Sequence, residues 1–550
     1  MFFLPAAIPP GSTFSSLAEF FQATDPANPN RKNFNAMIGS GPYKGELIDV
    51  GQFSFYAEDE YFATPRLSLT YGVRMDFPTY FTHPVANPFS TSLRALDQNG
   101  QPETIDQAKL PGATPMFSPR VGFNWDVHGD QSTRFRGGSG LFTGRVPFVW
   151  IGNVISNPGA NPNLYPQGPQ IPTRQGSVLE QSFDLNAMTK NFKWPQTWTT
   201  DLAGEQNLPW GTRGVLELIY AKDIYNIFMR NADLVRPVRT LPDGRPYYGG
   251  AGNNELNPDG GAGIYVIDNT RKGYSFNATG QLRKTFTIGS AGVGYSFTDA
   301  KNTLKSTEIA SVLWQNQPIK GDPNRPELSY SEFGQRHRLI GDGTYVKRWS
   351  NRFNSQIGLF MEVAEGNRFA GAGGNRYSFI YSGDVNGDGS GGNDLIYIPR
   401  SQSEIRFAPL VRGSVTISPA EQWSQLDAFI RQDSYLGKHR GQIADRFGLV
   451  NPWYTNVDMR FLQDIALPGG RQQQTLQVSL DVMNVGNLLN SSWGVRKIAD
   501  PTATSPLTFV RFDPDGTPVF NFTGPSRTFI DDPDLLSRWR VQLGAKYFFQ

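Results

Sequence analysis

Apolar and polar residues alternate along residues 50–76, with one short interruption. Leu67, Leu69 and Tyr71 share one side of this segment, and the residues between them are Ser and Thr. A period of two residues predicts β-strands. Only residues 63–66 separate the two alternating runs. We therefore expect two antiparallel strands joined by a tight hairpin.

The same pattern recurs to the end of the chain and predicts six hairpins and one final strand, about 13 strands in all. Turns of a few residues, such as 209–211 and 468–470, join the strands of each hairpin. Connections of about 30 to about 90 residues join one hairpin to the next. The strands expected after the first hairpin are 120–127 with 134–141, 194–208 with 212–223, 272–286 with 289–300, 335–347 with 353–363, 453–465 with 472–485, and 537–549.

This strict alternation of short and long connections is typical of an all-β transmembrane antiparallel β-barrel, with short periplasmic turns and long extracellular loops. Rows of Leu, Val, Phe and Met would face lipid, and rows of charged and hydroxyl side chains would line a wet lumen. A soluble protein built from several β-sheets is the alternative. Very long loops count against it, because they are uncommon in compact soluble domains.

Two parts of the chain depart from the strand pattern. Residues 1–49 are irregular, and we interpret them as a loop remnant that precedes the barrel portion at residues 50–550. The longest connection, residues 366–452, is expected to be a large extracellular loop insertion with secondary structure of its own. Within it, Trp423, Leu426 and Phe429 recur at helical spacing, which predicts an amphipathic helix over residues 421–433.

Composition narrows the function classes. The chain has 51 basic and 49 acidic residues, so its charge gives no case for binding nucleic acid. It has no cysteine, which excludes thiol catalysis, cysteine-bound metal and disulfides. A mean hydropathy of -0.42 with no long apolar run argues against a transmembrane helix. The first residues also lack the charged region of a signal peptide.

No residue constellation predicts an enzyme. The histidines are scattered, and the common nucleophile, zinc and phosphate-binding motifs are missing from the sequence. Glu58 and Glu60 lie in phase on one strand, where a pair of carboxylates could serve acid/base catalysis. A wet lumen wall explains the same pair more simply.

One motif predicts a metal site. Asp384, Asn386 and Asp388 stand at positions 1, 3 and 5 of a Gly-containing loop, the spacing of oxygen ligands in an EF-hand-type calcium loop. Position 12 is Leu395 rather than Glu, and Asp394 falls one residue short of it. We expect Asp394 or a backbone carbonyl to complete a structural Ca²⁺ site, and no other cofactor. The alternative is a solvated Gly-rich turn.

Several of these segments resemble a known family. Residues 53–74, 117–125 and 476–490 resemble barrel strands of TonB-dependent outer-membrane receptors. Residues 393–400, Asn-Asp-Leu-Ile-Tyr-Ile-Pro-Arg, and the terminal strand resemble the Oar-like or SusC-like branch. The resemblance spans residues 50–550. It departs from the family in two respects: a plug domain and a TonB box are not visible, and the chain ends on Gln550 after two aromatic residues.

The resemblance implies a receptor in the outer membrane of a Gram-negative bacterium that takes up a peptide, an oligosaccharide or a metal chelate. It implies a barrel of about 22 strands, of which this chain would supply the C-terminal part. The implied partners are outer-membrane lipid, the TonB complex through the missing plug, and a surface lipoprotein lid. The alternative function is a surface interaction protein or a passive pore.

Overall fold

The computed structural model describes residues 48–84, 86–87, 90–157, 173–174, 177–178, 184–257, 263–304, 309–368, 377–467 and 474–549. Most of the predicted irregular segment, residues 1–47, and the predicted turn at 468–470 lie outside the described residues. Secondary structure is 51% strand and 11% helix, so the expected all-β class is confirmed.

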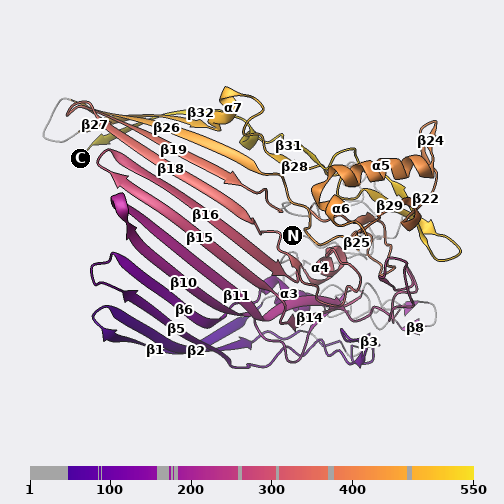
Figure 1. Cartoon of the computed structure of the whole chain (residues 1–550). Coiled ribbons are helices and arrows are strands. Elements are labelled where there is room, and N and C mark those ends of the chain that lie inside the picture. The colour runs from indigo at the N-terminus through magenta and orange to yellow at the C-terminus, as the bar shows by residue number, and fades with distance from the viewer. Residues whose placement is uncertain are drawn as a thin grey trace, which may run out of the picture.

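One large antiparallel sheet dominates the molecule and curves across the left of Figure 1. Among the described residues it contains 16 strands, of which β9, β14 and β17 branch off the main order. The remaining strands follow one another in chain order: β1 (Val50–Thr64), β2 (Leu67–Tyr80), β5 (Met116–Asp126), β6 (Thr133–Thr143), β10 (Gln196–Leu208), β11 (Thr212–Asn231), β15 (Tyr274–Phe286), β16 (Gly289–Asn302), β18 (His337–Arg348), β19 (Phe353–Ala364), β26 (Tyr454–Leu467), β27 (Gln474–Met483) and β32 (Arg540–Phe549).

The six predicted hairpins and the final strand are all present. Their register places the predicted apolar rows on one common face. For example, Tyr61 pairs with Leu69, and Phe461 pairs with Leu480. The partner of a residue in an antiparallel sheet points to the same side, so the apolar rows run continuously from strand to strand. We call this face the outer face and the opposite one the inner face.

The two ends of the strands differ. Tight turns such as residues 65–66 and η2 (Pro209–Gly211) lie at one end, on the left of Figure 1, which we call the short-turn end. The long connections gather at the other end, the long-loop end, together with the helices that Figure 1 labels. Strands β1 and β32 stand at opposite ends of the strand order.

The long connections fold into a body with its own hydrophobic cores, rather than remaining irregular. One core includes Phe379, Phe429 and Phe447, and a second includes Ile151 and Trp194. The helices and short strands here are β3 (Ala95–Leu96), β4 (Pro102–Glu103), α3 (Phe148–Ser156), β7 (Thr173–Arg174), β8 (Ser177–Val178), β9 (Leu185–Met188), β12 (Arg239–Thr240), β13 (Pro246–Tyr247), β14 (Ile264–Thr270), α4 (Ala310–Asn316), β17 (Ser329–Tyr330), β20 (Tyr381–Ser382), β21 (Tyr397–Ile398), η3 (Gln402–Glu404), β22 (Arg406–Phe407), β23 (Leu410–Arg412), β24 (Val415–Ile417), α5 (Pro419–Gln432), α6 (Ser434–Lys438), β25 (Gln442–Ile443), α7 (Val485–Leu489), β28 (Lys497–Ala499), β29 (Leu507–Phe512), β30 (Pro518–Phe522), β31 (Phe529–Asp531) and η4 (Leu535–Ser537).

Helix α5 confirms the helix predicted over residues 421–433, starting two residues earlier. Ser418 caps it in a capping box with Glu421, and Pro419 occupies the first turn. Leu426 and Phe429 are buried against the first core. The apolar stripe of α5 therefore packs inside the loop body. Within the described residues, no helix is long and apolar enough to cross a membrane.

Candidate functional site

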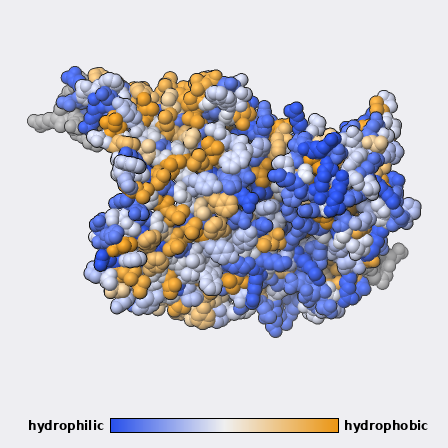
Figure 2. All heavy atoms as spheres, in the orientation of Figure 1, coloured by the Kyte–Doolittle hydropathy of each residue, from blue (hydrophilic) through white to orange (hydrophobic). Residues whose placement is uncertain are grey.

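The outer face exposes many large apolar side chains. Leu543 and Leu216 are 76% and 58% exposed, and Phe55 and Val121 are also exposed. Figure 2 shows hydrophobic residues spread over the strand region and mostly hydrophilic residues over the long-loop end. An apolar surface of this extent on a folded sheet marks contact with an apolar phase.

The inner face carries charged side chains that form ion pairs across strands. Glu205 on β10 accepts hydrogen bonds from Arg134 and Arg136 on β6, at 3.0 Å and 2.5 Å, and from Arg213 on β11. Arg136 also reaches Glu217 at 3.5 Å. One carboxylate at the centre of three guanidiniums fixes the inner wall near the short-turn end.

The two glutamates considered for acid/base chemistry lie on the same face. Glu58 forms an ion pair with Arg120, and the side chains of both residues are 40% exposed. The same face holds the Arg460–Asp481 ion pair at 2.8 Å. Glu58 is thus part of the charged inner wall, with no nucleophile or histidine described as its partner.

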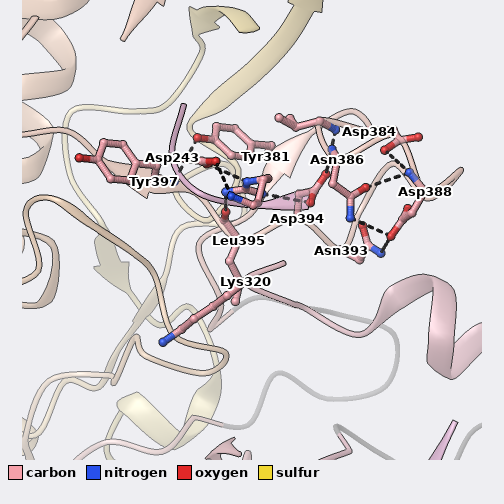
Figure 3. Close-up of polar contacts among 12 residues, drawn as sticks. Asp243, Lys320, Tyr381, Asp384, Asn386, Asp388, Asn393, Asp394, Leu395 and Tyr397 are labelled. Atoms are coloured by element: carbon pink, nitrogen blue, oxygen red, sulfur yellow. Dashed lines mark hydrogen bonds and ion pairs between the residues drawn. The ribbon is translucent and has the colours of Figure 1, made fainter. Parts of the chain in front are cut away.

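The structure brings the four predicted calcium ligands together in one loop, residues 384–394, which we call the acidic loop (Figure 3). Gly387 and Gly389 have φ of +72° and +93°, values that favour glycine. A Cβ atom on Gly387 would also meet the Tyr247 ring at 2.6 Å. Glycine is therefore required at position 387, because any other residue would have a strained backbone there and its side chain would clash with Tyr247.

Side chains of the acidic loop accept hydrogen bonds from its own backbone. Asp384 Oδ1 accepts from the amides of Gly387 and Asp388 at 2.6 Å and 3.2 Å, and Oδ2 accepts from Gly389 at 2.9 Å. Asn386 Oδ1 accepts from the Asp388 amide at 3.0 Å. The side chains at positions 1 and 3 thus point into the loop.

Asp388 is almost fully buried, and its carboxylate accepts only from neutral groups. Oδ1 accepts from the Ser390 amide at 2.8 Å, while Oδ2 accepts from the Nδ2 atoms of Asn386 and Asn393 at 3.0 Å and 2.9 Å. Burial, with the nearby charges of Asp394 and Asp384, raises the pKa of Asp388 to about 8. Burial and the charge of Asp394 raise the pKa of Asp384 to about 6.

Asp394 has a different role from the one predicted. Its Oδ1 pairs with Arg245 at 3.0 Å, and both side chains are fully buried. Its Oδ2 accepts from the backbone amides of Val385 and Asn386 at 2.8 Å and 2.9 Å. Arg245 also donates to Asp243 at 2.7 Å. Asp394 therefore ties the acidic loop to the segment that carries Arg245.

Among the described residues, no three His, Asp or Glu side chains are placed so that they could hold a metal ion together. A cation in the acidic loop would have to use amide or carbonyl oxygens as well. Three residues that contact or lie close to the acidic loop were not indicated by the sequence motif: Arg245, Asn254 and Asn393. Arg245 and Asn254 are far from the loop in sequence, and Asn393 lies outside the spacing of positions 1, 3 and 5.

Comparisons with known proteins agree with this architecture. The family model described as outer membrane beta barrel domain matches residues 35–509. No protein with a curated description matches the chain.

Solved structures similar to this chain include the outer membrane transporter YddB from Escherichia coli, with 11% identity and a TM-score of 0.39. They also include a mutant of the ferric enterobactin receptor PfeA from Pseudomonas aeruginosa, with 10% identity and a TM-score of 0.40. A third is the FrpB iron transporter from Neisseria meningitidis, with 12% identity and a TM-score of 0.38. The matches cover 91%, 91% and 92% of this chain but 45% of each of those chains. The chain thus spans less than half the length of these structures.

Proposed function

The chain belongs to the outer membrane beta barrel domain family, and we propose that it is the barrel portion of a TonB-dependent receptor of the Oar-like or SusC-like branch. Its location in the outer membrane of a Gram-negative bacterium and its non-enzymatic nature follow from the family. The long-loop end is accordingly extracellular and the short-turn end periplasmic.

The observation that carries the receptor proposal is the contrast between the two faces of the sheet. The outer face is apolar, as lipid contact requires. The inner face combines the Glu205 ion-pair network with large aromatic side chains, Tyr56, Phe142 and Phe360, which are 72%, 48% and 36% exposed. Large aromatic rings exposed to a water-filled lumen indicate a contact surface, and a plug domain inside the barrel would cover them.

The two sheet edges support a larger barrel. Within the described residues, β1 pairs only with β2, and β32 pairs only with β27. An open edge in lipid leaves backbone groups unsatisfied, at a cost of several kcal/mol for each group. We propose that residues 50–550 supply about 13 strands and that further strands close the barrel to about 22. The 366–452 segment would then be an extracellular insertion, as its place in the loop body favours.

The ligand class is a peptide, an oligosaccharide or a metal chelate that the extracellular loop body would capture. Among the named neighbours, two are an iron transporter and a ferric enterobactin receptor, so ferric enterobactin is a natural first probe. A surface lipoprotein lid and the TonB complex are the protein partners that this branch would have.

Uptake measurements test the proposal. Cells that produce the protein from its complete gene, in a strain lacking other receptors, would be given labelled ferric enterobactin, maltoheptaose or a decapeptide, with and without functional TonB. Energised uptake of one probe that stops when TonB is lost is the expected result. Uptake that continues without TonB would contradict the proposal and favour the passive pore. Surface binding without uptake of any probe would favour the interaction protein.

A further inference from the structure

The acidic loop lies in a cluster with too little positive charge. Asp243 and Asp394 pair with the single guanidinium of Arg245, whereas Asp384 and Asp388 lie near Asp394 and form no ion pair with another described residue. Figure 3 shows the Lys320 side chain directed away from the loop, and its Nζ pairs with Asp445 instead. Buried charges require compensation by opposite charge or by a metal.

A second observation points to the same place. Asn393 is fully buried, and its Nδ2 lies 2.9 Å from Asp388 Oδ2, while its Oδ1 has no hydrogen-bond partner among the described residues. Asn254, of which 5% is exposed, also has an unpartnered Oδ1, and its Nδ2 lies close to Gly389. Leaving a buried acceptor unpartnered costs about 1–3 kcal/mol. An unpartnered amide oxygen on the residue that contacts Asp388, whose carboxylate accepts only from neutral groups, indicates a missing cation.

We propose that the acidic loop binds one Ca²⁺ through the carboxylates of Asp384 and Asp388 and the amide oxygens of Asn386 and Asn393. Calcium takes six to eight oxygen ligands, including carboxylate and amide oxygens, with flexible geometry. The buried Oδ1 of Asn393, which has no hydrogen-bond partner among the described residues, is available as one of these ligands. Asn393 thus takes the place predicted for Asp394, which pairs with Arg245 instead.

Bound calcium would fasten three extracellular segments together. The Tyr248 amide donates to the Asn386 carbonyl at 2.8 Å, and the Ile319 amide donates to the Asn393 carbonyl at 2.8 Å. Ser390 Oγ donates to the Gln315 carbonyl. Segments 245–254 and 315–319 are therefore attached to the loop that holds the ion. Calcium binding here is independent of whether the barrel transports a ligand.

Isothermal titration of the folded, detergent-solubilised protein after treatment with a chelator tests the site. We expect one Ca²⁺ to bind with a Kd of about 10⁻⁴ to 10⁻³ M, as in extracellular modules, and Mg²⁺ to bind more weakly because it keeps its water shell. Asp388→Asn and Asn393→Ala should each weaken binding by about tenfold or more. Asp515→Asn is the matched control, because Asp515 is exposed and pairs with Arg406 outside the loop.

Limited proteolysis of the same samples gives a second readout. Calcium should slow cleavage around Gly387 in the wild type and in Asp515→Asn, and should have no such effect in Asn393→Ala. A wild type that binds no calcium at millimolar concentration, equal affinity for Mg²⁺, or unchanged affinity in both loop variants would each overturn the proposal. Asp388→Asn keeps the side-chain volume and removes a buried charge, so we expect it to fold.

Discussion

Arg245 and Asp394 form a fully buried ion pair, 3.0 Å between Nη1 and Oδ1, across 149 residues of sequence. Arg245 also donates to the Leu395 carbonyl at 2.6 Å. The pair joins two long connections of a membrane barrel whose strands place them at the same end. It is one of the contacts that hold the long connections in one body.

Replacing Arg245 should destabilise this body. Arg245→Met leaves the buried Asp394 carboxylate without its cation, which costs about 3–5 kcal/mol. The double variant with Asp394→Asn should regain part of that loss, because the fully buried carboxylate is then replaced by a neutral amide. Thermal unfolding of the loop body, followed by tryptophan fluorescence at a fixed calcium concentration, measures the stability of the single and the double variant. An additive double variant would contradict the coupling of the two residues.

Opposite faces of one strand should respond differently to a charge. Leu480→Arg on β27 places a cation in lipid and should cost about 2–4 kcal/mol near the bilayer centre. Gln477→Arg points to the inner face, where Gln477 already donates to Asp464 at 2.8 Å, and should be tolerated. Heat-modifiable gel mobility reports barrel assembly for both. Equal damage from the two variants would count against the assignment of the outer face.

Asp233 in the loop body should make stability depend on pH. Burial raises the pKa of its carboxyl, and its Oδ2 has no hydrogen-bond partner among the described residues. A raised folded-state pKa means that the folded protein holds the proton more tightly. Stability is then highest below the unfolded pKa of about 3.9 and falls as pH rises toward the folded value.

Asp233→Asn isolates this effect. The wild type should lose more stability than the variant between about pH 4 and pH 7, because Asn carries no proton that titrates. Thermal midpoints measured across this range give the difference. If the thermal midpoints of the wild type and the variant changed in parallel with pH, burial would not raise the pKa of Asp233.

Phe429 on α5 is 1% exposed and packs edge-on against Phe379, with ring centroids 6.4 Å apart. Phe429→Ala should cost about 3–5 kcal/mol, because it leaves a cavity in the core of the loop body. Arg431→Ala on the exposed side of the same helix should change stability by less than about 1 kcal/mol. Thermal unfolding measures the loss of stability in each of the two variants. A similar loss in both variants would mean that α5 does not pack through its apolar stripe.

The strands could be predicted from the sequence because alternation at period two is a local signal. Strands β1 and β2 pair in one register from Val50 with Tyr80 to Phe62 with Ser68. Helix α5 was predicted from the spacing of Trp423, Leu426 and Phe429, whereas its cap at Ser418 was not. The loop body was not predictable, because its core joins residues such as Leu241, Phe429 and Phe522 that are far apart in sequence. For the same reason Asp384, Asn386 and Asp388 were identified as a motif, whereas Arg245 and Asn254 needed the structure.

Glu205 should stabilise the inner wall because its negative charge offsets the mutual repulsion of three guanidiniums. Its side chain is 14% exposed, and it bonds Arg134, Arg136 and Arg213. Glu205→Gln keeps the shape but leaves these cations to repel one another, so the midpoint temperature of heat modification should fall. High salt should restore part of the lost midpoint temperature, because the screening length drops to about 3 Å at about 1 M and the repulsion between the guanidiniums weakens.

Glu58→Gln provides the matched control for Glu205→Gln. Glu58 pairs with Arg120 alone, and both side chains are 40% exposed. Such an exposed pair contributes about 0–1 kcal/mol, so its loss should shift the midpoint little and show little rescue by salt. A Glu205→Gln protein that behaves like Glu58→Gln at low and high salt would contradict a structural role for the three-arginine network. Salt rescue confined to Glu205→Gln would establish that the inner wall depends on this one carboxylate for charge balance.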